Sequence, residues 1–293
     1  MQPIRFHSDC IPCLIDKALN QIPENTSEDI KLSFAKTVLS VISEAPVTIT
    51  APEIVAKITD LVSETFGAKD NYNKIKKYFN SLMLSKVEYI SSKIKISDNP
   101  LYLSLCYAML GNYIDFGAMN NVDEDYLDSI LNTADKLDFD SSEFNNLKSD
   151  LENSKNLVYI TDNCGEIVMD KLFIEQIKKA YPLLDVTIIV RGAPVLNDAT
   201  IEDAIAVGLT NMGLVIPNGT NIAGTCLNKI SEKAKSAIEN ANVIIAKGQG
   251  NFETLSYSKE NIYYLFLCKC KLFADRFGVK RCTGMMLNDF RMK

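Results

Sequence analysis

The chain has 293 residues, of which 47% are hydrophobic and 23% charged, which is the composition of a globular protein of one or two domains. Its formal net charge of -6 argues against the basic surface that nucleic-acid binding requires, so we expect no nucleic-acid partner. No hydrophobic run approaches a membrane span, and the first residues lack a signal-peptide core. We therefore expect a cytoplasmic protein without a membrane partner.

The first part of the chain, residues 1–150, is predicted to form a helical domain. Asp9 is the expected N-cap of its first helix, and Pro12 lies in the first turn of that helix. Apolar residues then recur with helical spacing. The further predicted helices lie at 27–45, 50–66, 72–94 and 101–114, with one or two short ones within 123–153.

The second part, residues 151–293, is predicted to form an α/β domain. Runs rich in β-branched residues alternate there with segments of helical length, which favours a parallel sheet with right-handed crossovers. The expected fold is a doubly wound, mainly parallel sheet in an α/β/α sandwich, joined to the helical domain. The predicted strands are 157–160, 186–190, 214–217, 243–246 and 263–267.

Polar side chains follow the first two predicted strands. Asp162 and Asn163 lie in the segment TDNCGEIVMDK, and Asp198 lies in RGAPVLNDAT. Either aspartate alone is most often a helix cap or a turn residue. Ligands, however, bind beyond the carboxyl ends of strands in open parallel sheets, and carboxylate and amide oxygens suit a hard cation. The tandem therefore predicts a divalent cation bound by these three residues.

Three basic residues follow three different predicted strands: Arg191, Lys247 and Lys269. Each alone is as readily a solvated loop charge. Together, beside the predicted cation, they fit a phosphate ester held between the metal and side chains. Gly248 and Gly250, in KGQGNFE, permit close backbone approach, and amides in such a loop can cradle a phosphate.

The N-terminal motif CIPC contains Cys10 and Cys13. A CxxC pair is either half of a zinc site or a redox pair. No second CxxC or histidine pair completes a zinc site, since His7 is the single histidine of the chain. We therefore predict that these cysteines serve helix packing.

The segment GNYIDFG, residues 111–117, ends an apolar helix with two polar residues, Asn112 and Asp115. One interpretation is a turn at the C-terminus of the helix. The other is that the helical domain contributes a polar edge to the cleft.

Six motifs together resemble the metal-dependent damage-control phosphatases, also described as the acidic-residue-methyltransferase-like domain. The motif CIPC is similar to that of a subgroup with archaeal and bacterial members. The resemblance implies a helical N-terminal part packed on an α/β/α sandwich. The six motifs, in the order of the family and over nearly the whole chain, are CIPC, GNYIDFG, TDNCGEIVMDK, RGAPVLNDAT, KGQGNFE and FLCKC.

The resemblance also implies an activity: hydrolysis of phosphate monoesters of small metabolites, such as sugar phosphates, nucleotides or damaged metabolites. It implies one divalent ion, Mg, Mn, Co or Ni, bound by Asp162, Asn163 and Asp198. The catalytic residues would be Asp162, Asp198 and Glu166. Either Glu166 or a metal-bound carboxylate would orient the attacking water, and direct attack by an aspartate stays open. The expected substrate-binding residues are Asn112, Arg191, Asn197, Lys247 and Lys269.

Two other functions stay open at this point. An S-adenosylmethionine-dependent carboxyl methyltransferase would suit a Rossmann-like sheet, but no glycine-rich turn follows the first strand. A metal-stabilised module would bind a phosphorylated ligand without turnover. Metal-dependent release of inorganic phosphate distinguishes the phosphatase from both, and the sequence leaves the oligomeric state open.

Overall fold

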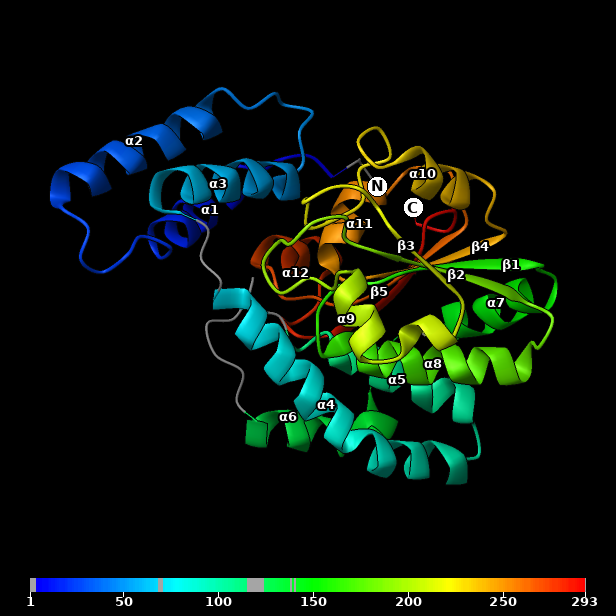
Figure 1. The fold of residues 1–293 in the computed structure, drawn as a ribbon. Coiled ribbons are helices and arrows are strands. Elements are labelled where there is room, and N and C mark those ends of the chain that lie inside the picture. The colour runs from blue at the N-terminus through cyan, green and yellow to red at the C-terminus, as the bar shows by residue number, and fades with distance from the viewer. Residues whose placement is uncertain (1–3, 68–70, 115–123, 138, 140, 293) are drawn as a thin grey trace.

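The computed structural model describes residues 4–67, 71–114, 124–137, 139 and 141–292. A six-stranded sheet lies at its centre between two layers of helices, and the helices α1–α3 project to one side (Figure 1). The strand order is β3-β2-β1-β4-β5-β6. The first five strands are parallel to their neighbours, and only β6 pairs antiparallel, with β5. The expected α/β class with a mainly parallel sheet is confirmed.

The N-terminal half of the described chain is helical. Its elements are α1 (Cys10–Leu19), α2 (Glu28–Ser43), α3 (Ala51–Phe66), α4 (Asn71–Ile96), α5 (Pro100–Gly111), α6 (Glu124–Leu131), the 3-10 turn η1 (Ala134–Lys136) and α7 (Ser141–Glu152).

The C-terminal half alternates strands and helices. Its elements are β1 (Asn156–Ile160), α8 (Glu166–Ala180), β2 (Asp185–Val190), α9 (Ile201–Ala206), η2 (Leu209–Asn211), β3 (Leu214–Pro217), α10 (Glu232–Glu239), β4 (Val243–Lys247), α11 (Gln249–Leu255), β5 (Ile262–Leu267), α12 (Lys271–Phe277) and β6 (Gly284–Asn288).

Local sequence signals explain where the helices begin. The carboxylate of Glu53 accepts hydrogen bonds from the backbone N–H and the hydroxyl of Thr50, both at 2.8 Å, and this capping box starts α3. The side chain of Asn99 accepts from the N–H of Tyr102 at the start of α5. Asp9 occupies the N-cap position of α1 as predicted, but its side chain makes no capping bond.

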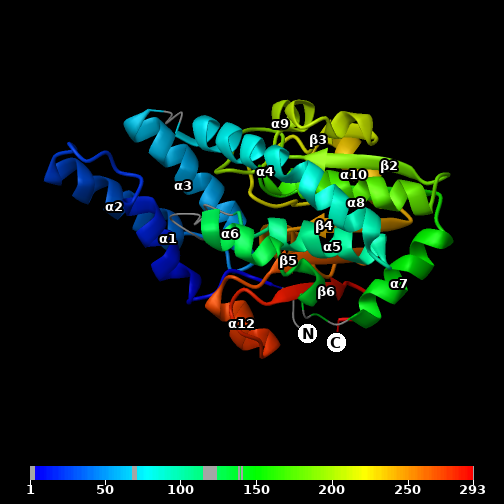
Figure 2. The same cartoon turned by 90° about the horizontal axis from the view of Figure 1, so that it is seen from below.

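Alternation along the strands builds a core on each face of the sheet. In β1, Leu157 and Tyr159 pack with α5 and α8, whereas Val158 and Ile160 pack with α10 and α11 on the other face. The first of these layers is thick, because α4 lies over α8 (Figure 2). The sheet is thus buried on both faces, as parallel sheets require.

The division of the chain into residues 1–150 and 151–293 stays a prediction. The hydrophobic cores do not separate at residue 150, because residues of α4 to α7 share one core with α8 and the sheet. The helices α1–α3 have a small core of their own.

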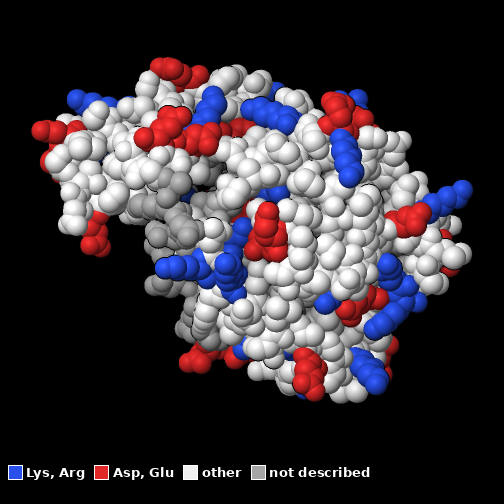
Figure 3. Space-filling model, in the orientation of Figure 1, with Lys and Arg blue, Asp and Glu red and all other residues white. Residues whose placement is uncertain are grey.

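On the face shown in Figure 3, acidic and basic side chains are interspersed rather than gathered by sign. No helix within the described ranges has both the length and the hydrophobicity needed to cross a membrane.

The order of the strands in the sheet reverses at β1, which is the switch point of the sheet. The strand β2 lies on one side of β1, and β4 lies on the other. The loops that follow β1 and β4 therefore diverge at the carboxyl edge of the sheet, which is where open α/β sheets bind ligands. This is the edge on which the predicted polar residues lie.

Candidate active site

The loops after β1 and β2 are joined by backbone contacts. Asn163 and Asp198 form an isolated antiparallel bridge, and the N–H of Ala199 donates to the carbonyl of Asp162 at 2.8 Å. These contacts bring together the three residues that the sequence predicts as metal ligands. Asp162, Asn163 and Asp198 are all buried, with at most 8% exposure.

The guanidinium of Arg191 lies between the two aspartates. Its Nε donates to Asp198 Oδ2 at 2.6 Å, and its Nη2 donates to Asp162 Oδ1 at 3.2 Å. Its Nη1 donates to the carbonyl of Gly224 at 3.2 Å and to Asn251 Oδ1 at 3.1 Å. Because Arg191 is only 1% exposed, this is a buried ion-pair network in which one cation serves two carboxylates.

Glu166, the first residue of α8, holds the amide groups around Asp162. Its Oε2 accepts from Asn163 Nδ2 and Asn112 Nδ2, both at 3.0 Å. Asn112 Nδ2 also donates to Asp162 Oδ2 at 3.1 Å, and Asn112 Oδ1 accepts from the N–H of Leu267 at 3.1 Å. Asn112 thus ties the end of α5 to the site, while Asp115 of the same motif lies outside the described residues.

Lys247, the last residue of β4, is fully buried beneath this cluster. Its ammonium donates to the carbonyl of Ala108 at 2.8 Å, and to Glu166 Oε1 and Asp170 Oδ1, both at 2.7 Å. An ammonium has three donors, and these partners use all of them. Burial lowers the pKa of Lys247, but the carboxylates of Asp170 and Glu166 outweigh burial and raise it. Contact of Lys247 with a phosphate stays a prediction.

Asp170 was not among the predicted site residues. Its Oδ1 accepts from Lys247 and, at 2.8 Å, from the hydroxyl of Tyr159. Burial raises the pKa of Asp170 to about 7, and the charge of Lys247 opposes that rise. The sequence did carry a signal, because Glu166 and Asp170 are four residues apart and so share one face of α8.

Asn251, in the first turns of α11, was also missed. Its Nδ2 donates to the carbonyls of Lys247, at 2.7 Å, and Thr161, at 3.1 Å, while its Oδ1 accepts from Arg191. One amide therefore joins the ends of β1 and β4 to the bridging arginine. The only hint in the sequence was a polar residue four positions after Lys247.

The glycines of KGQGNFE pack closely against other parts of the chain, and the phosphate cradle stays a prediction. Gly248 has a φ of 82°, and a Cβ built there would lie 2.0 Å from Asp162 Oδ2. A Cβ on Gly250 would lie 2.1 Å from the carbonyl oxygen of Ala223. In both places the close approach that glycine permits is used by protein atoms. Gly248 therefore allows the Asp162 carboxylate to pack against the β4–α11 turn.

Two further predicted residues lie near the same edge. Asn197 Nδ2 donates to the carbonyl of Ile114 at 3.3 Å, while Asn197 Oδ1 is buried and has no hydrogen-bond partner within the described part of the chain. Lys269 lies two residues beyond β5 and is 6% exposed, and its backbone carbonyl accepts from Arg281 Nε at 2.8 Å. Their predicted contacts with substrate stay predictions.

The CxxC cysteines lie on α1. Cys10 is half-buried and packs against the α1–α3 core, whereas Cys13 is exposed. Burial raises the pKa of Cys10 to about 11, and neighbouring groups, among them Glu253 and Cys270, contribute. Among the described residues, no three His, Cys, Asp or Glu side chains are placed to hold a metal ion. The packing role stays the prediction.

We expect the double substitution Cys10→Ser with Cys13→Ser to leave phosphate release within a few-fold of the parent. The reason is that neither thiol is among the residues that contact Asp162 or Asp198 in the hydrogen-bond network above. Parallel phosphatase assays and metal analysis of both proteins would check this. Stoichiometric zinc in the parent that is lost in the double variant would contradict it.

A pH effect on stability is expected from Glu253 of α11. Burial raises its pKa from an ordinary 4.5 to about 7, against the hydrogen bond donated by Gln249 at 3.0 Å. Between these values the folded protein holds a proton that the unfolded chain has released. The contribution of Glu253 to the stability of the folded protein is therefore fully present below pH 4.5, and it is lost as the pH rises through 7. Glu253→Gln should flatten this dependence in urea unfolding, whereas Glu64→Gln, at an exposed position, should not.

The fold and the site together define an α/β/α sandwich protein with an oxygen-rich, arginine-bridged site at the switch point of its sheet. The chain belongs to the family described as the damage-control phosphatase ARMT1-like domain, whose model matches residues 6–283. The resemblance expected from the six motifs is thereby confirmed.

Relatives and a solved structure agree with this assignment. Damage-control phosphatase PH1575 of Pyrococcus horikoshii is 31% identical over 296 residues, which cover 99% of this chain and 100% of the relative. The crystal structure of PH1575, described as a duf89 family protein, has a TM-score of 0.84 at 28% identity and covers 98% of this chain and 99% of its own. MJ0202 of Methanocaldococcus jannaschii, described as uncharacterized, is 31% identical over 98% of this chain and 96% of its own. The relatives named as phosphatases support a phosphatase role for this chain.

Proposed function

We propose that the protein is a divalent-metal-dependent phosphatase that hydrolyses phosphate monoesters of small metabolites. The observation that carries this proposal is the pairing of Asp162 with Asp198, two buried carboxylates from neighbouring strand ends that share one cation. Burying a carboxylate costs free energy unless a positive charge lies next to it. Two buried carboxylates side by side therefore form a site that favours a bound cation. The family membership supports the phosphatase role.

The donor set fits a hard metal ion. Asp162, Asn163 and Asp198 would hold it through carboxylate and amide oxygens, which suit Mg, Mn, Co or Ni more than soft metals. The unpartnered Asn197 Oδ1, next to Asp198 in the chain, is a further oxygen acceptor with no other use among the residues described. When bound, the ion supplies charge neutralisation for the phosphoryl oxygens and a more acidic water.

Arg191 has a distinct part in this proposal. Its guanidinium pairs with one oxygen of each of the two carboxylates proposed to bind the metal, so a bound metal would compete with it for their charge. A guanidinium released from these carboxylates has N–H groups in the geometry that a phosphate group accepts. We assign Arg191 to phosphate binding in the metal-loaded protein.

Glu166 and Lys247 have positioning roles. Glu166 Oε2 holds the amides of Asn112 and Asn163, and Glu166 Oε1 is held by Lys247. Both amides donate to Asp162 Oδ2, so Glu166 and Lys247 hold the Asp162 carboxylate in place through them. Fixed donors and charges stabilise a transition state without the cost of reorganisation at the moment of reaction.

The test is phosphate release from a panel of sugar phosphates and nucleotides. Chelator-treated protein should be inactive, and adding Mg, Mn, Co or Ni in turn should restore release with at least one metal. Methyl transfer from S-adenosylmethionine, measured on the same preparation, should be absent. Release that is unaffected by chelator, or no release over the whole panel, would refute the proposal.

A further inference from the structure

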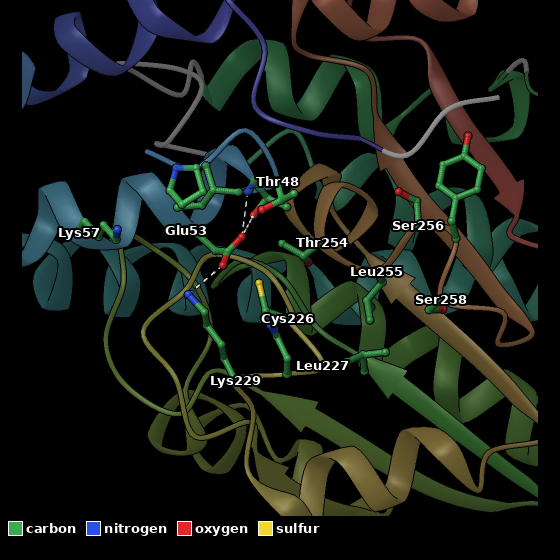
Figure 4. A pocket seen from close by; sticks show the side chains of 15 residues that line it. Thr48, Glu53, Lys57, Cys226, Leu227, Lys229, Thr254, Leu255, Ser256 and Ser258 are labelled. Atoms are coloured by element: carbon green, nitrogen blue, oxygen red, sulfur yellow. Dashed lines mark hydrogen bonds and ion pairs between the residues drawn. The ribbon is translucent and has the colours of Figure 1, made fainter. Parts of the chain in front are cut away.

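A cavity lies apart from the cluster around Asp162 and Asp198, which is called the carboxylate site below. It has a volume of about 540 Å³, within the range of roughly 300–1,000 Å³ typical of small-molecule pockets. Its walls are the first two turns of α3 with the segment before them, residues 226–229, and residues 254–258 at the end of α11 (Figure 4). It therefore lies where the α1–α3 part meets the sheet domain, and none of Asp162, Asn163 and Asp198 lines it.

Two hydroxyl groups on one wall of this cavity lack partners. The Oγ atoms of Ser256 and Ser258 are buried, and neither has a hydrogen-bond partner within the ranges described. A buried polar group without a partner costs free energy. The backbone between and beyond them is also strained, since Tyr257 has a φ of 67° and Lys259 a φ of 71°. Unpaired polar groups and strain of this kind gather at ligand sites.

The opposite wall carries an excess of positive charge. Lys57 and Lys229 both line the cavity, together with one acid, Glu53. Glu53 Oε1 pairs with Lys229 at 2.8 Å, and Glu53 Oε2 is occupied by the capping box of α3 (Figure 4). The acid is therefore already neutralised within the wall. The side chain of Lys57 is exposed at the cavity. The lining therefore carries one net positive charge, which an anionic ligand would match.

We propose that this cavity is a second binding site, for a small organic anion. Lys57 and Lys229 would hold its carboxylate or phosphate group. The hydroxyls of Ser256 and Ser258, buried in the wall, would turn about χ1 into the cavity to donate to oxygen atoms on its body. The cavity volume limits the ligand to metabolite size.

The wall of the cavity is hydrogen-bonded to the carboxylate site. Thr254, which lines the cavity, accepts from the N–H of Thr225 at 2.7 Å. The hydroxyl of Thr225 donates to Asn251 Oδ1 at 2.8 Å, and the same oxygen accepts from Arg191. A ligand that shifts this wall is thus linked through three successive hydrogen bonds to the arginine that bridges Asp162 and Asp198.

Calorimetric titration with three matched sugars tests the proposal on the whole chain in chelator. The probes are glucose, gluconate and glucose 6-phosphate, which share a six-carbon skeleton and differ in the anionic group. We expect saturable binding of gluconate or glucose 6-phosphate, and no binding of glucose. The preferred anion identifies whether the natural ligand is a carboxylate or a phosphate. Binding of glucose as tight as that of both anions, or no binding of any probe, would overturn the proposal.

Paired variants assign the binding to this cavity. Lys57→Gln with Lys229→Gln should weaken the anion by about tenfold or more, since charge-assisted hydrogen bonds are lost. Ser258→Ala should weaken it less. Lys36→Gln with Lys233→Gln removes the same charge from exposed positions on α2 and α10 and should leave binding unchanged. Asp198→Asn should also leave it unchanged. Binding that survives the first pair, or that falls equally in the control pair, would show that this cavity is not the site.

Discussion

Replacing Asp198 with Asn is expected to reduce metal-dependent phosphate release by roughly a hundredfold or more. The substitution keeps the size of the side chain but removes one of the two carboxylates that share a buried cation. A metal ion bound as proposed would lose one of its two charged ligands, and added metal should restore release only in part. Phosphate release measured across a metal titration checks the result.

A matched variant separates this effect from a general loss of stability. Asp203 is also buried and pairs with a buried lysine, Lys76, at 2.7 Å, but its partners lie outside the carboxylate cluster. Asp203→Asn should therefore lower the melting temperature without changing the metal dependence of release. If both variants lose release to the same degree, the role assigned to Asp198 is wrong.

Lys247→Met is expected to lower the free energy of unfolding by about 3–5 kcal/mol, the usual cost of breaking a buried ion pair. The ammonium of Lys247 contacts Glu166 and Asp170, and all three side chains are fully buried. Its removal leaves two carboxylates facing each other without a cation. Urea unfolding at neutral pH measures the loss.

A double-mutant cycle shows whether Asp170 is the partner responsible. Adding Asp170→Asn to Lys247→Met should recover part of the lost stability, because one uncompensated carboxylate is removed. Lys76→Met, which breaks the buried pair with Asp203, is the control and should lower stability without abolishing phosphate release. A Lys247→Met protein that keeps full stability and loses only phosphate release would instead favour the predicted phosphate contact.

Much of the fold follows from local patterns in the sequence. The five strands predicted from β-branched runs all occur, because residues buried on both faces of a parallel sheet give continuous apolar stretches. The strand β6 was missed. Its core residues Met285, Met286 and Leu287 suit a helix as well as a strand, and only pairing with β5 decides between these states.

The sequence predicted that Asp162, Asn163 and Asp198 lie together, but that prediction did not include Asp170 or Asn251, nor how the buried charges pair. The rule that parallel strands end at one edge is sufficient to bring Asp162 and Asp198 together. That Arg191 bridges them, and that Lys247 points to Asp170, depends on which buried charges find partners once the helices have packed. Such choices are set by tertiary contacts between distant segments. Composition and periodicity do not contain them.

The switch of strand order at β1 has a consequence for the protein as it is synthesised. The strands β1 and β2 emerge from the ribosome before β4, yet the cluster around Asp162 needs Lys247 from β4, and Asn112 is anchored by Leu267 at the end of β5. A nascent chain that ends before Lys247 therefore has its acidic loops and Arg191, but it lacks the ammonium that pairs with Glu166 and the Leu267 N–H that anchors Asn112. Early folding of such a chain therefore relies on hydrophobic contacts, first in the small core of α1–α3 and then in the layer of α4, α5 and α8.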